Sequence, residues 1–117
     1  MKKNIYLFLI VISLMNISMV EAKDKMMLKL KDGIVEIELF NEVAPNHVKR
    51  FKELANTGMY DNVVFHRVID GFMAQTGDVK YGNSSSNEFN LSLAGTGGSD
   101  LPNVKAEFSN VAHVRGT

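Results

Sequence analysis

The sequence predicts a mainly β domain with one helix near its start and a long polar loop. Three observations lead to this fold class. Apolar and charged residues alternate on both sides of Asp32-Gly33, two short apolar segments flank Asp70-Gly71, and the segment between these turns has helical spacing. A period of two indicates a strand with one buried face, whereas a spacing of three or four indicates a helix. The length of 117 residues favours a single domain.

Residues 1–22 have the composition of a secretory signal peptide. Lys2 and Lys3 give a positive start, residues 5–15 form an apolar run, and Ala22 offers a small residue for cleavage. The alternative is a membrane anchor, but a spanning helix needs about 20 apolar residues and this run ends sooner. We therefore expect cleavage after Ala22, a periplasmic or secreted protein, and no membrane segment after cleavage.

The composition excludes several functional classes. The 13 basic and 13 acidic residues give a net charge of zero, whereas a nucleic-acid-binding domain carries a basic stripe. We therefore expect no nucleic-acid partner. The sequence has no cysteine, which excludes disulfides, thiolate metal sites, a cysteine nucleophile and a lipoprotein anchor. An exported protein of this kind is stabilised by its core alone.

The stretch MLKLKDGIVEIELF, residues 27–40, predicts a β-hairpin. Leu28 and Leu30 alternate with lysines before the turn, and apolar residues alternate with Glu36 and Glu38 after it. An Asp-Gly pair between alternating segments is a strong hairpin signal, because both central residues of a type I′ turn need positive φ. One face of the hairpin would be apolar, and on the other lysines would face glutamates across the strand pair.

Residues 42–58 predict a helix. Pro45 fits the first turn, where its missing N–H is not needed, and Gly58 fits the left-handed position beyond the last turn. Four apolar residues share one helical face: Val48, Phe51, Leu54 and Ala55. We expect His47, near the helix start, to be solvated, because no second His or Cys stands at the spacing that a metal site needs.

A second strand pair is predicted over residues 59–69 and 72–77, joined by a tight turn at Asp70-Gly71. The apolar content and the turn glycine carry this prediction. From the pattern alone, the large apolar residues after the turn fit core positions, and Arg67 fits a surface charge.

The composition of the chain changes after residue 77. Residues 78–102 are rich in serine, glycine and asparagine, which predicts a long mobile loop. Two Asn-x-Ser sequences in this loop are interpreted as ordinary polar residues rather than glycosylation sites. The glycine-rich residues 94–100 lack the strand-to-helix context of a phosphate-binding loop. Residues 103–117 carry a short apolar set in which His113 is expected to be solvated.

Residues 65–78, FHRVIDGFMAQTGD, resemble the cyclophilin family of peptidyl-prolyl isomerases. The family pattern is Phe-His-Arg-Val-Ile, a turn ending in Gly, Phe-Met-x-Gln, and a closing Gly-Asp, and each fixed residue is present at the matching spacing. Asp70 and Thr76 replace a proline and a glycine that are commoner in the family. The flanking segments agree, because GTGG, residues 95–98, resembles the family's glycine loop, and KAEFSN, residues 105–110, resembles the strand that follows it.

The resemblance spans residues 25–117 and implies a cyclophilin-like closed antiparallel β-barrel with capping helices. We expect this barrel to be incomplete here, with the N-terminal hairpin, one helix, the central strands and the long loop. Family members continue after the match to Thr117 with further strands and a second helix. Residues 23–117 are therefore predicted to be a partial cyclophilin-type domain. The segment 79–94 is longer than the family pattern, which implies an enlarged loop beside the site.

The resemblance also implies isomerisation (rotamase activity) of proline-containing polypeptides during the folding of exported proteins, by a monomer. It implies Arg67 as the donor to the prolyl nitrogen, Gln75 as the residue that orients it, and His66 as a residue lining the catalytic site. Substrate binding is implied for three residues: Phe72, Met73 and Gly95. The reaction makes and breaks no covalent bond and transfers no proton, so we expect no metal, no cofactor and no general base.

Two other readings are open at this point. The family completes its proline socket with residues that lie beyond the match to this sequence. Without those residues, the chain would be either a non-catalytic remnant that binds proline peptides or a fragment that does not function alone.

Overall fold

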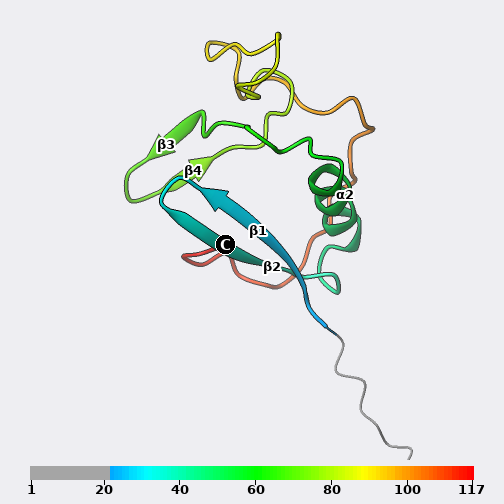
Figure 1. The fold of residues 1–117 in the computed structure, drawn as a ribbon. Coiled ribbons are helices and arrows are strands. Elements are labelled where there is room, and N and C mark those ends of the chain that lie inside the picture. The colour runs from blue at the N-terminus through cyan, green and yellow to red at the C-terminus, as the bar shows by residue number, and fades with distance from the viewer. Residues whose placement is uncertain (1–21) are drawn as a thin grey trace, which may run out of the picture.

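The computed structural model describes residues 22–117 (Figure 1). The predicted signal peptide, apart from Ala22, lies outside these residues. The elements in chain order are β1 (Asp24–Leu30), β2 (Gly33–Leu39), α2 (Pro45–Asn56), β3 (Arg67–Ile69) and β4 (Met73–Gln75). The strands form two separate antiparallel pairs, β1–β2 and β3–β4. This is a partial, mainly β fold with one helix, and the two pairs do not close into a barrel within the described residues.

The β1–β2 hairpin has one apolar and one charged face, as predicted. Met26 pairs with Ile37, and Leu28 with Val35. Cross-strand partners point to the same side of a sheet, so these residues form the apolar face. On the other face Lys25 Nζ lies 2.6 Å from Glu36 Oε1. An exposed ion pair of this kind contributes little to stability. The apolar face is itself only partly covered, since Val35 is 46% exposed.

The turn of this hairpin differs from the prediction. Leu30 pairs with Gly33, so the two loop residues are Lys31 and Asp32. Neither of them has positive φ, and the predicted type I′ turn at Asp32-Gly33 is wrong. Gly33 is instead the first residue of β2, because strand pairing extends one residue further toward the turn than the Asp-Gly signal indicates.

Helix α2 ends as the sequence predicts. Gly58 adopts a left-handed φ of 74°, its N–H donates to the carbonyl of Ala55 at 3.1 Å, and the N–H of Met59 donates to the carbonyl of Leu54 at 2.9 Å. These two bonds satisfy carbonyls that the last helical turn leaves free, in the Schellman arrangement. A residue with a Cβ at position 58 would be strained in this conformation.

The core of residues 22–117 is small and is centred on this helix. Its buried apolar residues are Val48, Leu54 and Val79. Phe51, which was predicted on the buried face, is 42% exposed and packs its ring against Tyr60, with 5.9 Å between ring centroids. The helix is also short and amphipathic, and no helix among the described residues has the length and apolar character needed to cross a bilayer.

The start of α2 is held by a residue from the far end of the chain. The Glu107 carboxylate accepts the backbone N–H of Asn46 at 3.0 Å and that of His47 at 3.1 Å. The side chains of the same two residues donate to it at 2.7 Å each. The first turn of a helix leaves its N–H groups without partners and favours negative charge. His47 is therefore hydrogen-bonded to Glu107, while 42% of its side chain is exposed, so the prediction that it is solvated holds only in part.

This contact predicts a pH-dependent stability. Burial raises the pKa of Glu107, but the hydrogen bonds from His47 and Asn46 lower it more, so the pKa falls from 4.5 to about 2. A carboxyl group with a lower pKa in the folded state stabilises that state above pH 4.5, and this contribution is lost as the pH falls through about 2. We expect Glu107→Gln to lower the melting temperature by several degrees at pH 6 and by much less at pH 2.

Circular dichroism melting at both pH values checks this expectation. Glu88→Gln is the matched control, because it removes the same charge from an exposed loop residue. Equal melting temperatures for Glu107→Gln and the parent at pH 6 would contradict the assigned role of the carboxylate.

One predicted strand forms only in part, and another does not form among the described residues. Only Arg67–Ile69 of the predicted strand 59–69 is a strand, and before it Val63 makes an isolated bridge to Asn83. No strand lies within residues 103–117, although 105–110 resembles one by family pattern. A strand needs hydrogen bonds to a neighbour, and these segments find no continuous neighbour among the described residues.

The predicted loop 78–102 contains no helix or strand. Its irregular backbone therefore agrees with the sequence, and its mobility stays a prediction.

Candidate functional site

The β3–β4 hairpin brings the predicted catalytic residues together. Arg67 pairs directly with Gln75, and Ile69 pairs with Met73. Residues paired across strands share a face, so the guanidinium, the amide and the methionine side chain all project from one side of the hairpin. Arg67 and Gln75 are both exposed, and no hydrogen bond joins their side chains in this part of the chain. Gln75 is therefore adjacent to Arg67 without being bonded to it.

The turn between the strands displays the predicted apolar socket residues. Gly71 has a φ of 71°, and the N–H of Phe72 donates to the carbonyl of Ile69 at 3.1 Å. Phe72 lies at the tip and is 76% exposed, whereas Met73 is half-buried. Among the described residues, this apolar surface is open to solvent on the side of Phe72.

His66 joins the hairpin to the glycine loop. Its backbone N–H donates to the carbonyl of Gln75 at 3.1 Å, one residue out of the register in which Arg67 pairs with Gln75. Its ring lies against Gly95, where an added Cβ would come within 2.7 Å of His66 Nε2. Gly95 also has a left-handed φ of 99°, so both the space and the backbone favour glycine there. His66 Nδ1 is buried without a hydrogen-bond partner in the described chain.

Asp78 organises the loop beside these residues, a role that the sequence analysis missed. Its carboxylate accepts four backbone N–H groups. Oδ1 accepts from Lys80 at 3.0 Å and Tyr81 at 2.9 Å, and Oδ2 accepts from Gly95 at 2.7 Å and Gly97 at 2.9 Å. Burial raises the pKa of Asp78, but these bonds lower it more, so its pKa lies below the ordinary value. The local signal was an aspartate opening a loop, which often accepts N–H groups two and three residues later.

Thr76, the departure from the family's commoner glycine, also has a place in this arrangement. Its hydroxyl donates to the carbonyl of Val64 at 2.9 Å. This bond links the chain after β4 to the chain before β3, an interaction that a glycine at position 76 could not make.

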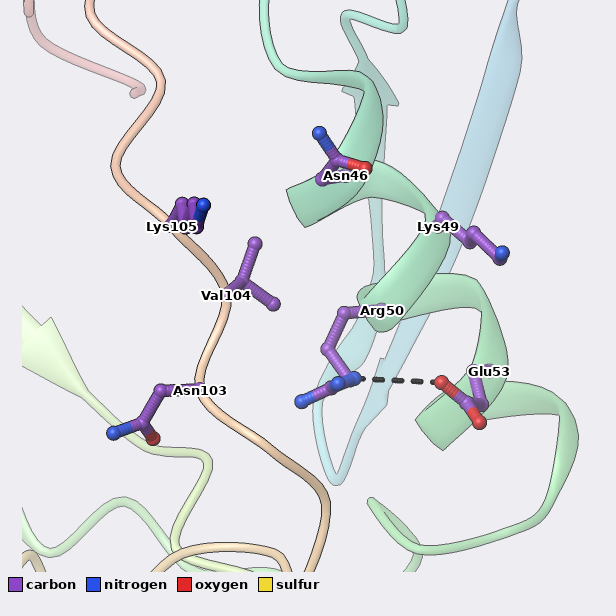
Figure 2. Close-up of a pocket in the computed structure, with 7 residues that line it drawn as sticks. All are labelled: Asn46, Lys49, Arg50, Glu53, Asn103, Val104 and Lys105. Carbon is purple, nitrogen blue, oxygen red and sulfur yellow. Dashed lines mark ion pairs between the residues drawn. The ribbon is translucent and has the colours of Figure 1, made fainter.

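A cavity in the described part of the chain is separate from these residues. It has a volume of about 410 Å³ and lies between α2 and the segment 103–105 (Figure 2). On α2, Arg50 pairs with Glu53 at 3.3 Å, and Arg50 also donates to the carbonyl of Pro102 at 2.8 Å. None of the predicted site residues lines this cavity. Among residues 22–117, no group of three or more His, Asp or Glu side chains is arranged to hold a metal ion.

Comparison with known proteins identifies the class to which this hairpin and glycine loop belong. Residues 25–117 match the family described as "Cyclophilin type peptidyl-prolyl cis-trans isomerase/CLD". The chain belongs to the cyclophilin-type peptidyl-prolyl cis-trans isomerase family.

Individual relatives agree with this assignment. The chain is 51% identical over 100 residues to a "Probable peptidyl-prolyl cis-trans isomerase" of Brucella suis biovar 1 and to a protein of the same name from Brucella melitensis biotype 1. These matches cover 86% of this chain and 50% of each relative. A "Peptidyl-prolyl cis-trans isomerase-like 1" of Aspergillus niger is 42% identical over 74 residues, covering 56% of this chain and 46% of that protein. The chain thus spans about half the length of these curated relatives. No solved structure gives a significant match.

Proposed function

We propose that this chain carries the catalytic hairpin of an exported peptidyl-prolyl cis-trans isomerase that acts on proline-containing polypeptides. The observation that carries the proposal is the register of β3–β4, in which Arg67 lies opposite Gln75 and Met73 projects from the same face. A permanently charged guanidinium beside an apolar surface is the combination expected to stabilise a twisted prolyl bond. Residues 1–22 have the composition of an export signal, which supports a periplasmic or secreted location.

The chemistry follows from the amide itself. Rotation about an X–Pro bond faces a barrier of roughly 18–20 kcal/mol, because resonance is lost, and the uncatalysed reaction takes on the order of 10–100 s. A catalyst needs only to bind the twisted amide better than the planar one. As the bond twists, the prolyl nitrogen regains a lone pair. The guanidinium of Arg67, which is always charged and has rigid donors, would stabilise that nitrogen.

The remaining residues have binding roles in this proposal. Phe72 and Met73 would contact the proline ring, and Gln75 would orient either Arg67 or the substrate backbone. His66 and Gly95 would form the wall beside the reacting bond. None of these residues acts as an acid or base, because the reaction moves no proton.

A second candidate is a non-catalytic proline-peptide-binding protein. The observation that favours it is the exposure of Phe72, because 76% of this residue is open to solvent. A socket formed on one side binds a proline ring weakly and holds the adjacent bond loosely, and loose positioning removes much of the rate gain.

A protease-coupled assay with a short proline-containing peptide distinguishes these functions. We expect the purified chain to accelerate cis-to-trans conversion above the uncatalysed rate. Saturable peptide binding without acceleration would instead support the second candidate, and neither binding nor acceleration would reject both. An N-terminal sequence beginning at Lys23, read from protein recovered outside the cytoplasm, would support export.

A further inference from the structure

Asp78 is the only buried charged residue in the described part of the chain, with 5% of its surface exposed, and the proposed mechanism does not use it. All four of its side-chain bonds go to backbone N–H groups, two at each end of the loop 79–94. A buried carboxylate that accepts several N–H groups is held in place strongly. Asp78 therefore fixes where the loop leaves the β4 strand and where it returns.

The returning end fits closely around this carboxylate. A Cβ added at Gly97 would lie 2.6 Å from Asp78 Oδ1 and 2.9 Å from Tyr81 Cδ2. Real Cβ atoms are essentially never closer than 3.0 Å to such atoms. The backbone at residue 97 therefore touches the aspartate directly, and its position depends on that contact.

The same segment forms the contact with His66. Gly95, whose N–H donates to Asp78 Oδ2, leaves no room for a side chain between its backbone and the His66 ring. His66 is next to Arg67 in the chain and bonds to Gln75 on the opposite strand. Asp78 thus contacts Gly95, and Gly95 contacts His66. His66 in turn adjoins Arg67 and Gln75, the proposed catalytic pair.

We propose that Asp78 is a positioning residue, which holds Gly95 against His66 and thereby fixes the wall of the proline site beside Arg67. This inference rests on the proposed function. The simpler alternative is that Asp78 only stabilises the loop. The geometry favours positioning because both N–H groups on Oδ2 belong to the segment that touches His66, whereas loop closure alone does not require this segment to contact the site.

Two neighbouring glycines provide a matched test. Gly97→Ala forces a Cβ against Asp78 Oδ1, whereas a Cβ at Gly98 meets no atom within 4 Å. Neither backbone has a left-handed φ, so alanine strains neither position directly. In the full chain, we expect Gly97→Ala to shift the NMR signals of the His66 ring, to speed hydrogen exchange at the Gly95 N–H, and to raise the Kd for a proline peptide about tenfold, equivalent to ~1.4 kcal/mol. Gly98→Ala should match the parent in all three measurements.

A second pair of variants tests the same contact by changing the carboxylate of Asp78. Asp78→Asn keeps the shape but can accept on only one side-chain oxygen, whereas Asp100→Asn removes the same charge from an exposed loop residue. We expect only the buried variant to change the His66 signals. Should Asp78→Asn fail to fold by circular dichroism, the glycine pair decides the result.

The outcomes separate this inference from the proposed function. His66 signals that change in Gly97→Ala but not in Gly98→Ala support positioning, and signals that stay at parent values in Gly97→Ala overturn it. Faster exchange at Gly95 with unchanged His66 signals would leave Asp78 as a loop anchor only. The His66 signals are recorded without peptide. A parent chain that binds no proline peptide therefore rejects the proposed function, while the ring signals still decide the positioning role.

Discussion

Replacing Arg67 with alanine is expected to lower kcat/KM for a proline peptide about 100-fold, with little change in stability. The reason is differential binding: in the proposed mechanism the guanidinium would donate to the prolyl nitrogen only when the amide is twisted, so its removal would affect the transition state more than the bound peptide. A charged hydrogen bond contributes about 1.5–3 kcal/mol, and each ~1.4 kcal/mol corresponds to tenfold in rate. Arg67 is exposed, so its removal leaves no buried group without a partner.

The same isomerase assay with two further variants separates the effect of the guanidinium geometry from the effect of its charge. Arg67→Lys keeps the charge but loses the planar set of donors, so we expect a rate between those of the parent and the alanine variant. Arg115→Ala is the matched control, because it removes an exposed arginine far along the chain from the hairpin. An alanine variant at position 67 that isomerises proline as fast as the parent, at equal melting temperature, would exclude Arg67 as the catalytic donor.

Local structure was the part of the fold that the sequence predicted well. The helix over 42–58 was expected from Pro45, the apolar spacing and Gly58, and the structure places it at Pro45–Asn56 with the glycine beyond its end. The β1–β2 hairpin likewise has the predicted faces. These features depend on residues within a few positions of each other, so their signals are present in short windows of sequence.

Contacts between distant segments were the part that the sequence did not predict. Glu107 bonds to the start of α2 across 61 residues, and Asp78 bonds to Gly95 across 17. Each carboxylate satisfies N–H groups that no local residue reaches. The sequence around Asp78, or around the strand-like KAEFSN segment, does not specify which N–H groups will lie beside each carboxylate. Their identity depends on how the whole chain folds.

The strand predicted over 59–69 forms only at its end, Arg67–Ile69, for a different reason. Its apolar content is high, but Asn62 has a φ of 60°, and the N–H of Asp61 donates to the carbonyl of Gly58 at 3.1 Å. Turn bonds therefore continue past the helix end and take up the backbone before pairing begins. The composition of this segment indicates a high β propensity. Its conformation is determined by the hydrogen bonds available to it.

The proposed catalytic residues were chosen from the sequence pattern, whereas their arrangement in space required the strand register. From the sequence alone, Arg67 fitted a surface charge and Phe72 fitted a core position. The structure keeps Arg67 exposed and leaves Phe72 exposed as well. An arginine opposite a glutamine, next to an exposed aromatic residue, is poorly explained by packing alone. Other apolar residues, such as Phe108 and Leu91, are exposed as well, so the binding role proposed for Phe72 rests on its place beside Met73 at the tip of the hairpin.

The candidate site depends on a small core, so a single substitution in that core should have a large effect. Leu54 is 7% exposed and is one of three buried apolar residues in the described chain. Removing a buried leucine side chain costs about 2–5 kcal/mol, and a whole domain is typically stabilised by about 5–15 kcal/mol. We expect Leu54→Ala to lower the free energy of unfolding by about 2 kcal/mol or more, measured by urea denaturation of the full chain.

Leu91→Ala is the matched control for this prediction. It deletes the same atoms from a residue that is 65% exposed, so its effect should stay within about 0.5 kcal/mol. Equal losses in the two variants would mean that α2 is not packed as the structure describes, since burial is the property that separates the two leucines. A large loss at Leu54 alone would place the main stabilising contact of the chain on the helix, away from the hairpin. The exposed residues of the hairpin would then be free to serve binding and catalysis, because little of the folding energy depends on them.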